Sequence, residues 1–472
     1  MNKVYLTTAI PYVNGKPHIG HAIDYCQADV CARYYRLLGD EVRLQAGTDE
    51  HGTKIYQKAE VAGVPVQQYV DGNAKEFKDF IAKLGVSYTD FVRTTDPDHE
   101  RRVQEIWQKL RDHIYMGKYE GWYCAGCERY ITQKEYDENN GICPDHQKSY
   151  EKLEEENYYF RISDFKEQIK AAIENGEMRI LPEFRQKEIL RLLQDSPDVS
   201  VSRPREQLSW GVDVPDDPSQ VMYVWIDALS NYLTVLGYPD EDVSEWWPPV
   251  AQFVGKDILR FHAIIWPAML LGLGLPLPRN IVAHGFILSD GQKMSKSLGN
   301  VVDPVEVLDR HGPDAFRYYF LRHIDTFNDS DFTWEKYENA YNNELANDLG
   351  NLVQRLATLA AKNDVKIGND ANVAKLPDEY AELMNNYELG KCFDYVWGKL
   401  QELNRRIDEE KPWSLAKNGE KEKLDKCLKS LMRDLLEANY LLSPFLPDTA
   451  EKIKGIFADP IAPPETPLFP KD

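Results

Sequence analysis

The sequence predicts an α/β protein in which a Rossmann-like parallel sheet is split by an insertion and followed by an all-α C-terminal bundle. Three observations predict this fold. A strand, a helix and a second strand follow one another between residues 3 and 46, which is the order of a βαβ unit. The same order returns between residues 251 and 288. Beyond residue 300, apolar residues recur mainly at helical spacing.

The first βαβ unit begins with KVYLTTAI, residues 3–10, which is short, apolar and β-branched, as buried strands are. Turn-forming residues follow from Pro11 onward. Between residues 19 and 38 the apolar residues have the spacing of a helix, and Gly39 provides a stop. EVRLQA, residues 41–46, is the second predicted strand.

In the second unit, we expect a strand to end near residue 257, a proline-kinked helix over residues 259–274, and a strand over residues 280–288. The intervening stretch has a different composition, with many charged residues, and is interpreted as an insertion. The clearest helices of the C-terminal bundle are predicted over residues 340–361, 389–410 and 421–440.

Composition narrows the class of protein. A hydrophobic content of 43% supports a sizeable core, and the sequence has no apolar run of about 18 residues that could cross a membrane. The net charge, 56 − 77 = −21, argues against a general polyanion binder, although local basic patches could still contact nucleic acid. Seven cysteines over a long chain do not suggest a disulfide framework, and no signal peptide is predicted. We expect a soluble cytoplasmic protein.

The loop after the first strand, PYVNGKPHIGH, carries His18, Gly20 and His21 at a predicted helix start. Ligands of parallel sheets bind beyond the carboxyl ends of the strands, and a helix N-terminus suits phosphate. Gly20 leaves room for a nucleotide against the backbone, and two imidazoles can donate hydrogen bonds to phosphate oxygens. Taken alone, the loop could equally be a simple turn with structural histidines.

The second motif is KMSKS, residues 293–297, which follows the last predicted strand of the second unit. Lys293 and Lys296 place two ammonium groups on a loop at the ligand edge of the sheet. A solvated charged loop is the simpler alternative, but HIGH and KMSKS occur in order, each at a strand end. Neither a Walker pattern nor a GxGxxG fingerprint is present, so the sequence indicates neither a P-loop enzyme nor a dehydrogenase.

The insertion contains Cys124, Cys127, Cys143 and His146 in the spacing C-x2-C-x15-C-x2-H. Three thiolates and one imidazole, arranged in two close pairs, suit a closed tetrahedral zinc site, which predicts a structural zinc knuckle. A redox-active CxxC is the alternative, but it would not require the second pair.

HIGH and KMSKS on a split βαβ fold resemble the class I aminoacyl-tRNA synthetases, and the whole chain is most similar to the methionyl-tRNA synthetase family. The segments that carry this resemblance are PYVNGKPHIGH, AGTDEHG (46–52), the zinc knuckle, VWIDALSNYL (224–233), VGKDILRFHAIIWPAML (254–270), KMSKS and NRRIDEEKPW (404–413).

The resemblance implies ATP-dependent attachment of methionine to its tRNA through a methionyl-adenylate, with release of pyrophosphate and AMP. Lys293 and Lys296 would stabilise the departing pyrophosphate, His18 and His21 would hold phosphates, and Mg²⁺ would accompany ATP. It also implies a catalytic Rossmann-like domain with a zinc-knuckle insertion. The expected division is 1–115 and 221–300 for the two catalytic halves, 116–220 for the insertion, 301–340 for a linking segment and 341–472 for an anticodon-binding domain.

Methionine requires an apolar slot with aromatic walls, where sulfur–aromatic contacts favour it. The resemblance assigns Asp49 to the substrate ammonium group. Leu229 stands where the family often carries proline, and we interpret this as an apolar replacement in the wall of the slot that leaves its function unchanged. The expected slot consists of Ile10, Tyr12, Trp225, Ala228, Leu229, Tyr232, Phe261, His262 and Trp266.

The C-terminal helices are expected to recognise the anticodon of initiator and elongator methionine tRNAs. Unpaired bases are recognised by stacking and by hydrogen bonds to their edges. Trp413, after Pro412, offers a stacking surface, and Asn351 and Arg355 lie on one helix face. Core packing is the alternative for Asn351 and Trp413. We expect a monomer unless a C-terminal dimerisation module is missing.

Two other functions compete with this one. Leucine-, isoleucine- and valine-specific relatives would carry a much longer editing insertion, and a cysteine-specific relative would need a metal inside the active site. A catalytically silent RNA-binding paralogue is the alternative from another class, and the intact histidines and lysines of HIGH and KMSKS argue against it.

Overall fold

The computed structural model describes residues 1–124, 126, 129–289, 291–294, 300–366 and 376–471. Its centre is a six-stranded sheet in the order β3-β2-β1-β11-β12-β7, in which all neighbouring strands are parallel. This confirms the predicted parallel α/β core. The strands are β1 (Lys3–Thr8), β2 (Glu41–Thr48), β3 (Asp90–Arg93), β7 (Arg179–Leu181), β11 (Ala251–Gly255) and β12 (Asn280–His284).

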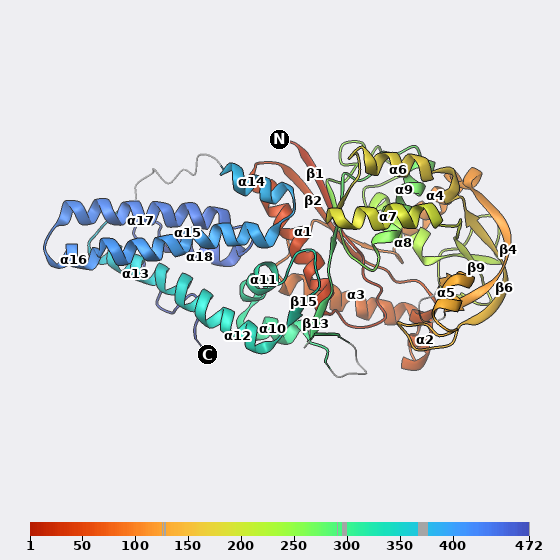
Figure 1. The fold of residues 1–472 in the computed structure, drawn as a ribbon, viewed down its shortest axis with the longest axis horizontal. Helices are drawn as coiled ribbons and strands as arrows, with labels where there is room; N and C mark the ends of the chain where they lie inside the picture. The colour runs from red at the N-terminus through yellow and green to blue at the C-terminus, as the bar shows by residue number, and fades with distance from the viewer. Residues whose placement is uncertain (125, 127–128, 290, 295–299, 367–375, 472) are drawn as a thin grey trace.

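The central strands β11 and β12 are buried along their whole length, and most of their residues are apolar, as expected for strands covered on both faces. Helices cover both faces of the sheet, and α1 crosses the middle of the molecule (Figure 1). The helices around the sheet are α1 (Ile19–Leu37), α2 (Thr53–Ala62), α3 (Val66–Lys83), α4 (Pro97–Lys109), α8 (Val224–Thr234), α9 (Trp266–Gly272), α10 (Pro304–His311) and α11 (Pro313–Arg322).

The strand predicted over residues 280–288 is in fact two strands. β12 ends at His284, and β13 (Ile287–Ser289) joins a second small sheet with β14 (Gln292–Lys293) and β15 (Ser330–Phe332). The chain turns at Gly285, where a Cβ atom would lie 2.3 Å from the backbone carbon of Asn328. KMSKS therefore leaves the β13–β14 hairpin and does not directly follow the main sheet.

The helix predicted over residues 259–274 also has two parts. Phe261–Ile265 is a π-helical turn, and α9 begins directly after it. Wide turns of this kind occur often at functional sites. The π-helical turn ends two residues before Pro267, the proline at which the sequence predicts a kink.

The insertion forms a four-stranded antiparallel sheet in the order β5-β4-β6-β8 at one end of the molecule (Figure 1). The segment expected as one insertion, residues 116–220, nevertheless returns to the main sheet, because β7 pairs with β12. Its elements are β4 (Ile114–Cys124), β5 (Arg129–Ile131), β6 (Glu151–Phe160), β8 (Val199–Ser200), β9 (Ser202–Pro204), β10 (Gln220–Met222), α5 (Gln133–Glu138), α6 (Lys166–Glu174) and α7 (Glu183–Asp195).

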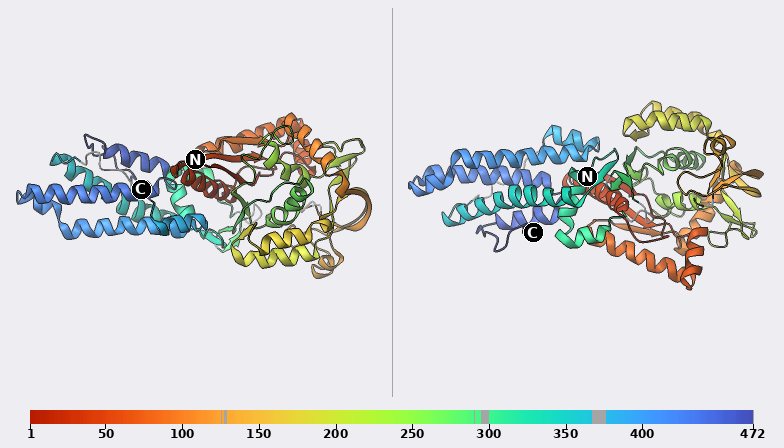
Figure 2. Two further views of the ribbon diagram at one scale, coloured as in Figure 1. Left: turned by 90° about the horizontal axis from the view of Figure 1, so that it is seen from above. Right: turned by 60° about the horizontal axis from the view of Figure 1, so that its bottom comes forward.

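The opposite end is all helical, as predicted (Figures 1 and 2). A rod runs from α12 (Trp334–Ala340) through the π-helical stretch Tyr341–Gly350 into α13 (Asn351–Lys362). The predicted helix over residues 389–410 is confirmed. The remaining helices are α14 (Asp378–Asn385), α15 (Leu389–Glu410), α16 (Pro412–Lys417), α17 (Lys421–Leu442) and α18 (Pro447–Ile456).

A buried ion pair joins the two parts. Asp29 on α1 contacts Arg317 on α11 at 2.8 Å, and both side chains are fully buried. Arg317 also donates hydrogen bonds to the backbone carbonyls of Pro444 and Phe445, between α17 and α18, at 3.0 and 2.7 Å. Among the described helices, none is long and apolar enough to span a bilayer.

Candidate active site

The histidines of HIGH lie where α1 begins. His18 precedes the first helical residue, and its ring stacks on that of His21 with centroids 3.5 Å apart and planes 20° from parallel. The backbone N–H of His18 donates to Nδ1 of His21 at 3.2 Å, so the neutral His21 carries its proton on Nε2. A Cβ atom at Gly20 would lie only 3.1 Å from the His18 ring. The two imidazoles are therefore held in fixed positions at a helix N-terminus.

Burial lowers the pKa of both histidines, and for His21 the neighbouring His18 and His284 lower it further. Both rings are therefore neutral at pH 7. A neutral imidazole can still donate one hydrogen bond to a phosphate oxygen, and its own charge does not have to be desolvated when the ligand enters.

The end of β12 lies beside this helix start. Nε2 of the buried His284 is 2.9 Å from Oδ1 of Asp24 on α1, and Nδ1 is 2.7 Å from the carbonyl oxygen of Gly285. Burial alone would lower the pKa of His284, but Asp24, together with the Gly285 carbonyl, outweighs burial and raises it. The two halves of the split domain thus meet at the ligand edge of one sheet.

The lysines of the second motif can be placed only in part. The backbone of Lys293 belongs to β14, where it pairs with Leu288 of β13. Lys296 lies outside the described residues, and so does the side chain of Lys293. Their contact with a triphosphate stays a prediction.

Most of the expected methionine slot comes from two neighbouring elements, α8 and the π-helical turn leading into α9. Trp225 and Phe261 stack face to face, with ring centroids 3.6 Å apart and planes 8° from parallel. Tyr232 lies 5.7 Å from the ring of His262 and 5.7 Å from that of Trp266. The residues of the expected slot that are buried here are Ala228, Leu229, Tyr232, His262 and Trp266.

The hydrogen bonds of His262 fix the direction of the Tyr232 hydroxyl. Burial lowers the pKa of His262 to about 4, so the ring is neutral at pH 7. Its Nδ1 is 3.1 Å from the carbonyl oxygen of Ile258 and must donate there, so Nε2 accepts. The Tyr232 hydroxyl, 2.7 Å from Nε2, therefore donates to His262 and presents its oxygen lone pairs elsewhere.

Ile10, Tyr12 and Asp49 form a second group at the ends of β1 and β2. Tyr12 and Asp49 form an isolated parallel bridge, in which the Asp49 N–H donates to Pro11 at 2.8 Å and the Asp49 carbonyl accepts from Val13 at 3.0 Å. A Cβ atom at Gly52 would lie 2.5 Å from the Tyr12 hydroxyl and 3.1 Å from Val224. Gly52 therefore allows this group to approach the start of α8.

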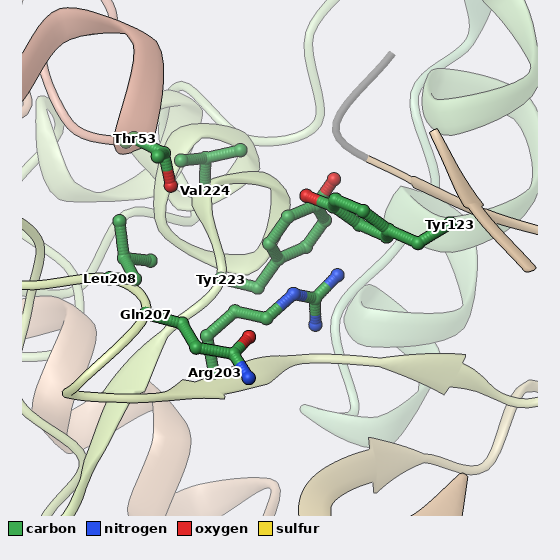
Figure 3. A pocket seen from close by; sticks show the side chains of 8 residues that line it. Thr53, Tyr123, Arg203, Gln207, Leu208, Tyr223 and Val224 are labelled. Atoms are coloured by element: carbon green, nitrogen blue, oxygen red, sulfur yellow. The ribbon is translucent and has the colours of Figure 1, made fainter. Parts of the chain in front are cut away.

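Two cavities adjoin these residues. Trp225 and Phe261 line a cavity of about 830 Å³ that extends to α5 and α7 of the insertion. A smaller cavity of about 170 Å³ lies beside Gly52 and Thr53 (Figure 3). Arg203 lines the smaller cavity, with its guanidinium carbon 4.1 Å from the ring centroid of Tyr223. The sequence did not indicate that Arg203 would be buried, because no motif distinguishes a buried arginine from the many exposed ones.

Three of the four expected metal ligands come together in the insertion. The ligand atoms of Cys124, Cys143 and His146 lie within 4.8 Å of one another, and Sγ of Cys143 is 3.6 Å from Nδ1 of His146. A sulfur and a nitrogen on one tetrahedral zinc ion would be separated by about 3.6 Å. The donor set therefore fits zinc, while Cys127 lies outside the described residues.

At the far tip of the helical end, α13 and α16 bring together most of the expected anticodon residues. The guanidinium carbon of Arg355 lies 5.6 Å from the ring centroid of Trp413, and its Nη2 is 2.8 Å from Oδ1 of Asp408. Trp413 is 40% exposed, whereas Pro412 is buried. Asn351 is exposed one turn before Arg355. The exposure of Trp413 argues against core packing as its main role.

Comparison with known proteins agrees with this geometry. The family model of "tRNA synthetases class I (M)" matches residues 4–357. Methionine–tRNA ligases of Caldanaerobacter subterraneus and Thermotoga maritima are 42% and 38% identical to the chain, over 95% and 96% of it and 73% and 74% of their own lengths. A solved structure of Mycobacterium tuberculosis methionyl-tRNA synthetase in complex with methionyl-adenylate aligns over all of both chains, with a TM-score of 0.90 and 34% identity. The chain belongs to the methionyl-tRNA synthetases of class I.

Proposed function

We propose that this enzyme, a methionine–tRNA ligase, activates methionine with ATP at the edge of the six-stranded sheet and transfers it to tRNA. The observation that supports this site best is the junction of the two half-domains. His18 and His21 at the start of α1 lie beside His284 at the end of β12, although more than 260 residues separate the segments. The mycobacterial relative with this fold was solved with methionyl-adenylate.

In the first step the methionine carboxylate attacks the α-phosphorus of ATP, and pyrophosphate leaves. We assign His18, His21 and the backbone at Gly20 to the phosphates, as neutral donors held in place before the substrate arrives. Lys293 and Lys296 would supply positive charge as pyrophosphate departs. Preorganised donors of this kind account for a large part of many enzymes' rate enhancement.

Methionine would lie against the aromatic residues of α8 and the π-helical turn, with its ammonium group on Asp49. Trp225 and Phe261 stack on each other here, and an apolar side chain can pack against either ring. Because the Tyr232 hydroxyl donates its proton to His262, neither group has a proton left for the thioether, which would be held by packing against the rings.

Zinc would be held by Cys124, Cys127, Cys143 and His146 as a structural ion, supplying a fixed tetrahedral crosslink to the insertion. Mg²⁺ would accompany ATP as counter-charge on its phosphates. Lys54 on α2 donates to the carbonyl oxygen of Gly126 between the first two cysteines, which ties the knuckle to the catalytic domain.

We assign recognition of the anticodon of initiator and elongator methionine tRNAs to Asn351, Arg355, Pro412 and Trp413. Arg355 and Trp413 are already adjacent and partly exposed, so a base can stack without a large rearrangement. A monomer that acts in the cytoplasm completes the proposal.

Exchange of labelled pyrophosphate into ATP, measured with each of the twenty amino acids, tests this function. Exchange that depends on methionine, with the others far weaker, is the expected result. Exchange with none of them would favour the silent RNA-binding paralogue and overturn the proposal.

A further inference from the structure

A cluster of buried titratable side chains lies behind the proposed methionine site and has no role in the steps above. Its centre is Asp227 on α8, which is 1% exposed. Nδ1 of His51 lies 2.8 Å from one carboxylate oxygen of Asp227, and Nε2 of His99 lies 2.8 Å from the other. Nδ1 of His99 is in turn 2.7 Å from the hydroxyl of Thr234 at the end of α8. Each carboxylate oxygen of Asp227 is therefore hydrogen-bonded to a histidine.

The imidazole of His51 is charged in this setting. Burial alone would lower its pKa, but Asp227, together with Glu100 at 3.4 Å from Nε2, outweighs burial and raises the pKa to about 10. The edge of Trp210 packs on the same ring, with centroids 5.4 Å apart. The groups that face His51 are thus Asp227 from α8, Glu100 and His99 from α4, and the uncharged Trp210.

The cluster joins three elements at the place where the substrate ammonium group is expected. His51 lies two residues after Asp49 in the loop that follows β2, Asp227 lies two residues after Trp225 on α8, and His99 belongs to α4. The loop is held on its other side by Trp210, whose indole N–H donates to the carbonyl oxygen of Glu50 at 2.7 Å.

We infer that His51, Asp227 and His99 are positioning residues that fix the Asp49 carboxylate relative to the aromatic wall carried by α8. The inference rests on the proposed function, because it assigns Asp49 to the ammonium group of methionine. A single turn of α8 carries both Trp225 and Asp227, so the bond from His51 sets the separation between the charged and apolar ends of the substrate site.

Packing alone does not account for this arrangement. Burying ionised groups carries a large desolvation cost, and apolar side chains of similar volume often hold elements together equally well. What the charged cluster adds is direction, because each hydrogen bond restricts both distance and angle. Such restriction matters where a carboxylate must meet a substrate ammonium group to within a fraction of an ångström.

Asp227→Asn keeps the volume and removes the charge. The control is Asp240→Asn, which changes a carboxylate that accepts from Arg102 of α4, the helix that carries His99, at 2.9 Å but is not bonded to His51 or Asp227. In pyrophosphate exchange we expect the KM for methionine to rise on the order of ten-fold in Asp227→Asn, while the KM for ATP stays within two-fold. Asp240→Asn is expected to match the wild type in both.

The pH profile separates positioning from general destabilisation. The groups of the wild-type pair titrate near 10 and near 2, outside the range from pH 6 to 9. Without Asp227, burial moves the titration of His51 into that range, and the neutral ring loses one of its two N–H donors. The ratio of methionine KM values, Asp227→Asn over wild type, should therefore rise with pH, and this rise should vanish in the double variant His51→Gln/Asp227→Asn.

Two results would overturn the inference if the melting temperature of Asp227→Asn matches that of the wild type. One is an equal rise in the KM for methionine and the KM for ATP, and the other is a ratio of methionine KM values that does not change with pH. If Asp227→Asn does not fold, Glu100→Gln decides, because Glu100 is 43% exposed and its loss is tolerable. A methionine KM raised about three-fold with ATP unchanged supports the inference, and wild-type values overturn it. Failure of the wild-type enzyme itself to exchange with methionine would instead refute the proposed function.

Discussion

The two sites proposed for this molecule, at the sheet edge and at the helical tip, are built on opposite principles. At the sheet edge, His18 and His21 stack on each other and are backed by the buried pair of Asp24 and His284. At the helical tip, Arg355 and Trp413 have 39% and 40% of their surface exposed and rest on rigid helices. The chemical end is arranged before any ligand arrives, whereas the recognition end offers side chains that a partner can cover. Changes at the first end should therefore affect rate and stability, and changes at the second should affect tRNA binding alone.

The largest effect is expected for Lys296→Ala. Loss of one charge that stabilises the departing pyrophosphate should reduce the rate of methionine activation 100- to 1000-fold, or about 2.7–4 kcal/mol in the transition state. Methionine affinity should change little. Single-turnover formation of the adenylate measures the rate, with Lys417→Ala at the helical end as the matched control. An unchanged rate would remove Lys296 from the mechanism.

Acid should destabilise the chemical end through His262. Its pKa is about 4 in the folded protein and about 6.5 when unfolded. Above pH 6.5 both states are neutral there, and as the pH falls from 6.5 to 4 only the unfolded state gains the proton. This residue should therefore cost about 3 kcal/mol of unfolding free energy by pH 4.

Urea unfolding of the wild type and of His262→Gln at pH 7 and pH 4 measures this loss. The variant should lose less stability on acidification, by roughly the stated amount. Trp413→Ala, at the other end, should follow the wild-type slope. Identical slopes for wild type and His262→Gln would show that His262 is not buried in its neutral form.

Trp413→Ala should separate the two ends most clearly. Stacking of one base on an aromatic ring contributes about 1–3 kcal/mol, so kcat/KM for charging tRNA should fall about 5- to 150-fold. Pyrophosphate exchange without tRNA should stay at the wild-type level. A parallel fall in both activities would mean that Trp413 supports the fold and does not contact the tRNA.

The smallest effect is expected for Asp408→Asn. The pair of Asp408 with Arg355 is exposed, so its loss should change the unfolding free energy by less than about 1 kcal/mol. Because Arg355 is released and a negative charge is removed, the KM for tRNA should fall about two- to five-fold. Steady-state charging at low ionic strength measures it, and Asp394→Asn, which removes the carboxylate paired with Arg322 instead, is the control. A rise in this KM would show that the ion pair holds Arg355 in its binding position.

Much of the fold was predictable because it depends on local periodicity. The strands at residues 3–8 and 41–48 and the helix at 389–410 are long and regular enough to be recognised from sequence. β7 was not predictable, because it has three residues and its partner β12 lies about 100 residues later. The break at Gly285 depends on a backbone contact with Asn328 that no local pattern encodes.

The candidate site divides in the same way. His18, His21 and the cysteine pairs belong to short motifs; the spacing of the cysteines indicated a metal site, whereas the histidines were indicated only together with KMSKS. Asp227 and His99 acquire their proposed roles only when separate elements pack together. Each is an ordinary polar residue in the sequence, and only the packed structure shows that its side chain is buried.

The buried contact between Asp29 and Arg317 also bears on how the sheet and the helical bundle are held relative to each other. Asp29 belongs to α1, at whose start His18 and His21 lie, and Arg317 donates hydrogen bonds to two carbonyl groups between α17 and α18. Tilting the bundle against the sheet would break a charge pair from which water is excluded, and losing one partner of such a pair typically costs about 3–5 kcal/mol. This pair is therefore expected to keep the distance between the sheet edge and the helical tip constant, and a tRNA that contacts both would have to fit that distance.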